Sequence, residues 1–100
     1  MPSIVGRFGE SAGNIWHKAM YHLYILRCAD DTLYTGITTD LGRRVAEHNR
    51  SPAGAKYTRA RRPVALVYAR RFRTRSNAQR EEARVKRLSR SAKLSLIQSA

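Results

Sequence analysis

The sequence has too few cysteines for an internal disulfide. It also has too few cysteines and histidines for us to expect a structural zinc site. Its 100 residues include one cysteine, Cys28, and three histidines. No stretch approaches the roughly 20 apolar residues that span a bilayer. Residues 1–18 also lack the continuous apolar run of a secretory signal. We therefore expect one small cytoplasmic domain without membrane association.

Acidic residues are also scarce, and their scarcity is local. The chain has 20 Lys and Arg against 7 Asp and Glu, a net charge of +13. Residues 43–90 hold 16 basic and 3 acidic side chains, whereas the rest of the chain holds 4 of each. Such a one-sided positive field attracts polyanions, above all nucleic acid. An arginine-rich surface that only maintains solubility is the competing interpretation, and we favour nucleic acid.

Hydrophobic patterning predicts an α+β fold that begins near residue 20. The expected elements are strands over 22–28 and 33–37, a helix from Leu41 with Thr39 or Asp40 as N-cap, a basic loop over 51–63, a strand over 64–69, a helix from Asn77 to about Leu88 capped by Ser76, and a last helix after Ser91. This β-β-α-β-α-α order suits a three-stranded sheet with helices packed against it. The domain covers 20–97, and residues 1–19 form an N-terminal extension that we expect to be flexible.

The helix that begins at Leu41 carries two polar residues on its apolar face. Leu41, Arg44, Val45 and His48 follow the i, i+3, i+4, i+7 spacing of one helix face. Leu41 and Val45 explain that face as core, but Arg44 and His48 do not belong in a core. Either the arginine lies at the edge and the histidine bonds to a backbone carbonyl, or the pair faces the strand hairpin for a functional reason.

The second long helix brings a carboxylate close to its buried face. Ala78, Val85 and Leu88 mark that face, and both Glu81 and Glu82 lie within reach of it. A charge near an apolar surface is costly unless it is paired or binds a metal. Helical periodicity does not decide which glutamate points inward. Either could simply pair with a neighbouring arginine or lysine on the helix surface.

Taken together, these motifs resemble the GIY-YIG nuclease superfamily, in particular its small stand-alone single-domain members. The stretches that carry the resemblance are His22-Leu23-Tyr24, Tyr34-Thr35-Gly36, Ile37 to Arg44, Glu47-His48-Asn49, Gly54 to Arg59, Arg62-Pro63-Val64 and Glu82 to Lys86. They span nearly the whole predicted domain. The first triplet departs from the family signature at two positions and the second at its middle position, Thr35.

The resemblance implies a three-stranded antiparallel sheet with flanking helices, and metal-dependent cleavage of phosphodiester bonds in DNA. It implies that Tyr34 hydrogen-bonds or deprotonates the attacking water, with Tyr24 beside it as a ligand of phosphate or water. Arg44 would clamp the scissile phosphate, and His48 would be a second polar or proton-handling group. The resemblance also favours Glu82 over its neighbour as the ligand of one divalent cation, Mg²⁺ or Mn²⁺.

Two functions are therefore compatible with the sequence. The first is a DNA endonuclease that acts in DNA repair or processing. The second is a basic nucleic-acid-binding module, on DNA or RNA, with little or no cleavage. The presence of all the site residues favours the enzyme, because a binding module would tolerate loss of the glutamate. In both cases we expect nucleic acid, chiefly DNA, to contact Arg43, Lys56, Arg59, Arg61 and Arg62.

A shared site for the two tyrosines also constrains the hairpin. Tyr24 and Tyr34 lie on one sheet face only if their strands pair residues of equal parity. That register requires a connection of three or five residues around Asp30 and Asp31, or a bulge. A four-residue loop would place the two hydroxyls on opposite faces.

Overall fold

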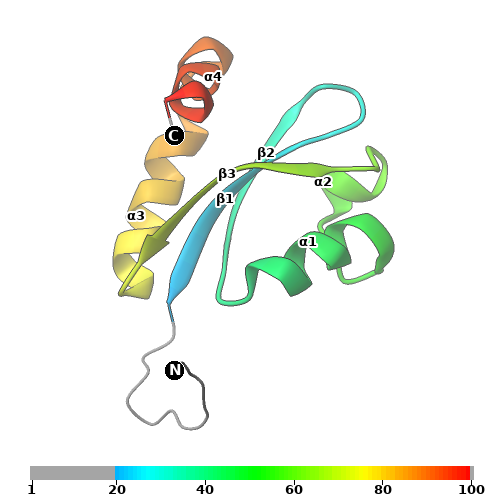
Figure 1. The fold of residues 1–100 in the computed structure, drawn as a ribbon, viewed down its shortest axis with the longest axis horizontal. Helices are drawn as coiled ribbons and strands as arrows, with labels where there is room; N and C mark the ends of the chain where they lie inside the picture. The colour runs from blue at the N-terminus through cyan, green and yellow to red at the C-terminus, as the bar shows by residue number, and fades with distance from the viewer. Residues whose placement is uncertain (1–19, 100) are drawn as a thin grey trace, which may run out of the picture.

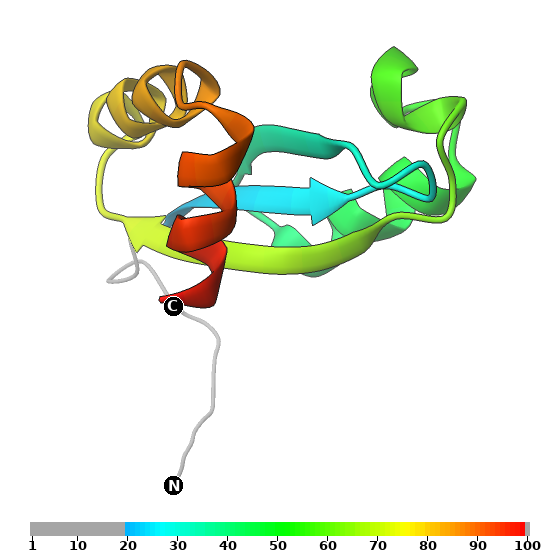
Figure 2. The same ribbon diagram turned by 90° about the horizontal axis from the view of Figure 1, so that it is seen from above.

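The computed structural model describes residues 20–99, so the expected flexible extension over 1–19 lies outside the described residues. The elements are strands β1 (Tyr21–Arg27), β2 (Leu33–Thr38) and β3 (Ala65–Phe72), and helices α1 (Leu41–Arg50), α2 (Lys56–Arg59), α3 (Arg75–Lys86) and α4 (Arg90–Gln98). The sheet separates α1 and α2 from α3 and α4 (Figures 1 and 2). The predicted α+β fold is confirmed. No helix within 20–99 is long and apolar enough to cross a membrane.

The three strands form one antiparallel sheet in the order β2-β1-β3. In the β1–β2 hairpin Arg27 pairs with Leu33, which leaves a five-residue connection over 28–32. Asp31 in this connection has a positive φ of 70°, a conformation that aspartate tolerates better than most residues. Paired residues have equal parity, so Tyr24 and Tyr34 lie on the same face, as the shared-site prediction required.

Helices cover the central strand β1 on both sides, which explains why its sequence is almost continuously apolar. On one side, which we call the α3 face, the buried residues are Leu23, Ile25, Tyr68 and Val85, and the last of these belongs to α3. Leu96 and Ile97 of α4 pack against the same cluster. On the other side, the α1 face, the buried residues are Tyr24, Leu26, Cys28 and Val64, and Leu41 and Val45 of α1 pack against them.

Two predictions about the middle of the chain are wrong in detail. The basic loop over 51–63 contains one helical turn, α2, so the observed order is β-β-α-α-β-α-α. The third strand does not end at residue 69 but continues to Phe72, where it pairs with Tyr21. Arg70 and Arg71 belong to this strand because a long arginine side chain is compatible with a strand whose outer edge faces solvent.

The helix caps follow the same physical rule as expected, but two of them use a different residue. The Asp40 carboxylate accepts a hydrogen bond from the Arg43 amide, which confirms it as the N-cap of α1. In α3 the cap is Thr74 and not Ser76, and in α4 it is Ser89 and not Ser91. Each capping side chain accepts a hydrogen bond from the third amide that follows it, which satisfies one free donor of the first turn.

Candidate active site

The two hairpin tyrosines lie next to each other on the α1 face. The ring centroids of Tyr24 and Tyr34 are 6.4 Å apart, and Tyr24 is 1% exposed. Gly36 is the cross-strand partner of Tyr24. A Cβ atom at this glycine would lie 2.6 Å from the Tyr24 hydroxyl oxygen, so the Tyr24 ring occupies the space of the missing side chain. The glycine after the second tyrosine therefore allows the first tyrosine to lie across β2.

Helix α1 supplies a histidine to the same place. His48 is fully buried, and its Nε2 atom lies 2.8 Å from the Tyr24 hydroxyl. Its Nδ1 atom lies 2.8 Å from the hydroxyl oxygen of Thr58 in α2. The Tyr34 ring centroid is 5.1 Å from that of His48. The alternative of a histidine satisfied by a backbone carbonyl is thus wrong, because both ring nitrogens contact side-chain hydroxyls.

The shared burial of Tyr24 and His48 keeps both groups uncharged at neutral pH. Burial raises the pKa of the Tyr24 phenol to about 12, although the neighbouring Arg44 guanidinium opposes the rise. Burial also lowers the pKa of His48 to about 4, and the positive charge of Arg44 lowers it further. A neutral imidazole and a neutral phenol share one proton in their hydrogen bond, so one of them must be the acceptor.

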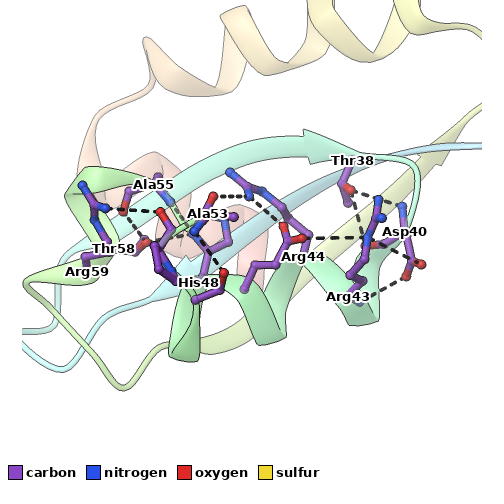
Figure 3. A network of polar contacts seen from close by, with 12 residues as sticks. Thr38, Asp40, Arg43, Arg44, His48, Ala53, Ala55, Thr58 and Arg59 are labelled. Atoms are coloured by element: carbon purple, nitrogen blue, oxygen red, sulfur yellow. Dashed lines mark hydrogen bonds and ion pairs between the residues drawn. The ribbon is translucent and has the colours of Figure 1, made fainter.

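Arg44 lies on α1 and reaches Ala53 in the loop that follows this helix (Figure 3). Its Nη1 atom donates to Glu47 at 2.8 Å and to the Ala53 carbonyl at 2.8 Å. The hydrogen bond with Glu47 raises the pKa of the guanidinium. The side chain is only 26% exposed. Arg44 is therefore a permanent positive charge, held in place by the protein beside the Tyr24 hydroxyl.

The two candidate glutamates of α3 face different surroundings. Glu81 makes hydrogen bonds of 2.9 and 2.6 Å with Arg84 and lies 3.6 Å from Arg70 of β3. Glu82 instead pairs with Lys86 at 3.3 Å. The Glu82 charge is among the causes that raise the pKa of Tyr24, whereas Glu81 has no such effect. Of these two glutamates, Glu82 is thus the one whose charge acts on Tyr24.

Two further residues of the site lie in α2, where the sequence showed no periodic pattern. Thr58 is fully buried against His48, and Tyr57 stacks on Tyr34 with ring centroids 5.9 Å apart. The Arg61 guanidinium covers Tyr57 at 3.9 Å from the ring centroid. Sequence reasoning assigned no role to Tyr57 or Thr58. The only available signal was their place within the Gly54–Arg59 stretch that carried the resemblance.

Comparison with known proteins shows the family to which the chain belongs. Residues 20–95 match the GIY-YIG catalytic domain. The chain belongs to the GIY-YIG superfamily of nucleases. Membership implies a nuclease-type hydrolase with a nucleic acid as substrate, and GIY-YIG nucleases generally use a divalent metal ion. The predicted family is therefore confirmed, and the matched region begins at the first residue of the predicted domain.

Relatives of this GIY-YIG domain are small stand-alone proteins of the UPF0213 family. A UPF0213 protein of Desulfotalea psychrophila is 51% identical over 83 residues, which make up 83% of this chain and 76% of the relative. A UPF0213 protein of Halobacterium salinarum is 53% identical over 78 residues, or 78% of this chain and 100% of the relative. The solution NMR structure of a UPF0213 protein from Bacillus halodurans has a TM-score of 0.53 and 46% identity, covering 79% of this chain and 83% of that chain.

The basic residues of the GIY-YIG domain divide into two groups. Arg62 donates to the carbonyl oxygens of residues 47, 48 and 51, at the C-terminal end of α1. Arg61 donates to Asp30 at 3.0 Å and to the Tyr57 carbonyl at 2.9 Å. Both side chains are thus engaged in holding the fold. Arg43, Lys56 and Arg59 are exposed, so their charges are accessible to a polyanion.

The donor atoms near Tyr24 are compatible with a magnesium-type ion but not with a zinc site. Within residues 20–99 no group of three or more His, Cys, Asp or Glu side chains could hold a metal ion. The charge of one α3 carboxylate, Glu82, acts on the Tyr24 phenol, whereas Glu47 is engaged by Arg44. Mg²⁺ takes oxygen ligands, keeps several waters and commonly uses one or two carboxylates together with substrate phosphate oxygens. A single glutamate would therefore be a sufficient protein contribution to such an ion.

Proposed function

We propose that this GIY-YIG domain is a metal-dependent endonuclease that hydrolyses phosphodiester bonds in DNA, in DNA repair or processing. The observation that carries the proposal is the convergence of Tyr24, Tyr34 and His48 on one buried cluster. The cationic Arg44 lies beside this cluster, and the Glu82 carboxylate lies within reach of it. Phosphodiester hydrolysis requires a positioned water, a cationic clamp on the phosphate and compensation of the developing negative charge.

Each side chain can be given one part of that task. Arg44 is fixed by Glu47 and the Ala53 carbonyl and presents a guanidinium to the scissile phosphate. Tyr34 is only partly buried, so its hydroxyl is available to orient the attacking water. Tyr24 lies beside it, with its hydroxyl tied to His48.

Glu82 is the protein ligand that we assign to one divalent ion, Mg²⁺ or Mn²⁺. When bound there, the ion would lower the pKa of a coordinated water and neutralise charge on the phosphate. The carboxylate would have to leave its ion pair with Lys86, which is a solvent-exposed contact of low energy. Because only one protein ligand is present, we expect the ion to bind weakly unless nucleic acid is bound.

The Glu82–Lys86 ion pair also supports a second candidate function. If the lysine remains on the carboxylate, no metal enters and the domain binds nucleic acid without cutting it. The exposed cations Arg43, Lys56 and Arg59 suit such a binding module equally well. The two functions differ in one observable property, which is whether cleavage depends on Glu82.

A metal-dependent cleavage assay with paired glutamate variants separates these functions. Purified full-length protein is incubated with single-stranded, duplex and branched DNA and with matched RNA, in Mg²⁺, Mn²⁺ or a chelator. We expect Glu82→Gln to lower the cleavage rate on the order of 10²- to 10³-fold, because the phosphoryl charge loses its compensation. DNA affinity should stay equal or rise, since one negative charge is removed. The matched control, Glu81→Gln, should cleave like wild type.

Three results would contradict the proposal. If wild type cleaves no DNA faster than Glu82→Gln does, the domain is a binding module. Cleavage of RNA in preference to every DNA form would overturn the assignment of DNA as substrate. Undiminished cleavage in the chelator would exclude the metal.

A further inference from the structure

A buried line of hydrogen bonds leads from the tyrosine site into α2. It runs from the Tyr24 hydroxyl to His48 Nε2 at 2.8 Å, and from His48 Nδ1 to the Thr58 hydroxyl at 2.8 Å. The Thr58 hydroxyl continues to the Ala55 carbonyl at 2.9 Å. The three side chains are at most 1% exposed. With solvent excluded, the positions of the protons are decided by these groups and by the protein donors that contact them.

Counting protons along this line fixes the direction of every bond. The Ala55 carbonyl has no proton, and two oxygens 2.9 Å apart attract each other only if a hydrogen lies between them, so Thr58 is the donor. Its hydroxyl has no second proton and must accept from the Nδ1–H of His48. In a neutral imidazole the Nε2 atom then carries no proton. It therefore accepts the proton of the Tyr24 hydroxyl.

One competing donor would favour the opposite arrangement. The Ala55 amide lies 3.4 Å from His48 Nδ1, and a hydrogen bond there would require Nδ1 to be the acceptor. A distance of 3.4 Å is longer than the usual range of about 2.7–3.2 Å between an N–H donor atom and its acceptor. The distance of 2.8 Å between His48 Nδ1 and the Thr58 hydroxyl lies within that range. The shorter contact decides the tautomer.

We propose that Thr58 is a positioning residue that holds His48 as the Nδ1–H tautomer, so that the Tyr24 hydroxyl donates inward and presents its lone pairs to the substrate site. The inference rests on the function proposed above. A Tyr24 oxygen in this state accepts a hydrogen bond from water and does not donate one to a phosphate oxygen. On this proposal Tyr24 is a water ligand, which is one of the two alternatives that the family resemblance left open. The opposite tautomer would turn the phenolic proton outward and make Tyr24 a phosphate ligand.

The tautomer can be measured without any cleavage. Long-range ¹H–¹⁵N NMR spectra of the full chain, labelled at histidine nitrogen, show which ring nitrogen carries the proton. The chain has three histidines, and the signals of His48 are assigned by their loss in His48→Gln. At neutral pH we expect His48 in the Nδ1–H form in wild type. An Nε2–H form in wild type would overturn the proposal, whatever the activity of the enzyme.

Two substitutions at Thr58 test its role. Thr58→Val keeps the shape but removes the hydroxyl, which leaves the Ala55 amide as the nearest partner of Nδ1. We expect His48 to change to the Nε2–H form and the cleavage rate to fall at least about tenfold, with DNA affinity unchanged. Thr58→Ser keeps the hydroxyl and should restore both the Nδ1–H tautomer and the rate.

A purely structural role for Thr58 gives a different result. In that case Thr58→Val lowers the melting temperature but leaves His48 as Nδ1–H, and the positioning role is refuted. If Thr58→Val does not fold, the wild-type and Thr58→Ser spectra still decide, because both must show the Nδ1–H form. If wild type shows the Nδ1–H tautomer but cleaves nothing, the nuclease proposal fails while the tautomer assignment holds.

Discussion

The two faces of the central sheet bury different kinds of side chain. On the α3 face, aliphatic side chains such as Leu23, Ile25 and Val85 surround one tyrosine, Tyr68. On the α1 face, Tyr24 and His48 are buried just as completely, and they are joined by hydrogen bonds. Both faces exclude water to a similar degree, but only the α1 face buries a hydrogen-bonded pair of polar side chains, Tyr24 and His48.

That difference indicates which face is built for chemistry. Burying a hydroxyl or an imidazole costs several kcal/mol in an apolar medium, and hydrogen bonds within the protein do little more than offset this cost. Apolar side chains of similar volume would stabilise the α1 face at least as well. The polar cluster of Tyr24, His48 and Thr58 is therefore better explained by what it does to a substrate than by what it adds to stability.

A matched pair of tyrosine substitutions should give the largest contrast between the faces. Tyr34→Phe removes a hydroxyl that we assign to the attacking water, and should lower the cleavage rate on the order of 10²- to 10⁴-fold. Tyr68→Phe removes a hydroxyl on the α3 face and should leave the rate unchanged. Neither variant should shift the midpoint of urea unfolding by much, because the ring and its packing remain. Equal rates for the two variants would break the distinction between the faces.

Acid should weaken the α1 face first. The pKa of His48 is lowered from 6.5 to about 4 by burial, so the unfolded chain binds a proton that the folded chain refuses. The contribution of His48 to stability is fully present above its pKa in the unfolded chain. It declines as the pH falls toward the pKa of His48 in the folded chain. The free energy of unfolding should fall by at most about 1.4 kcal/mol per pH unit. The total loss between pH 6.5 and about 5 is then at most about 2 kcal/mol.

Urea titrations at a series of pH values measure this decline, and His48→Gln is the control that should lack it. Two carboxylates, Asp30 and Glu81, do not interfere in this window. The hydrogen bond from Thr32 lowers the pKa of Asp30, and that from Arg84 lowers the pKa of Glu81, so both lose their stabilising effect only at lower pH. A wild-type profile as flat as that of His48→Gln would show that His48 is not held neutral by the fold.

The smallest expected effect concerns the charges that guide nucleic acid to the α1 face. Arg59 in α2 is exposed, and Arg87 at the end of α3 is exposed on the other side of the sheet. Arg59→Gln should reduce the slope of log affinity against log salt by about one unit, as expected for one lost phosphate contact. Arg87→Gln should leave the slope unchanged. DNA-binding titrations over a range of salt measure both, and the reverse order would place the nucleic acid on the α3 face.

The sequence predicted most of the fold because the strands and α1 have strong local patterns. Asp40 precedes a clear helical repeat, and the apolar runs of β1 and β2 flank an Asp-Asp turn. The end of β3 could not be found, because Arg70 and Arg71 lie on an edge strand where their charges reach solvent. The caps of α3 and α4 were missed because several serines and threonines stand near each helix start and only the local backbone selects one.

The site was predictable to the extent that single elements carry it. The spacing of Arg44 and His48 placed both on one face of α1, and a parity rule gave the loop lengths at which the two tyrosines share a sheet face. The choice of Glu82 over its neighbour depends on where α3 lies relative to β2, which helical periodicity does not contain. Thr58 lies in a short segment without a pattern, and its partner His48 belongs to another element.

The roles of Arg61 and Arg62 show a further limit of sequence reasoning. A composition count treats every arginine as a free charge. In the folded chain Arg62 donates hydrogen bonds to three carbonyl oxygens at the C-terminal end of α1. Arg61 binds Asp30 and so joins α2 to the loop between β1 and β2. The partners of these side chains are backbone carbonyls and a distant aspartate, which no local pattern reveals.

The close contact between Gly36 and the Tyr24 ring makes these two positions a single unit of variation. A side chain at position 36 is compatible with the fold only if residue 24 becomes smaller, and a smaller residue 24 has no phenol. In a library of variants, a change at position 24 alone therefore removes the Tyr24 ring, and a change at position 36 alone displaces it. A chain that gives up this glycine must replace the tyrosine in the same step, and the two sites are then best randomised as a pair.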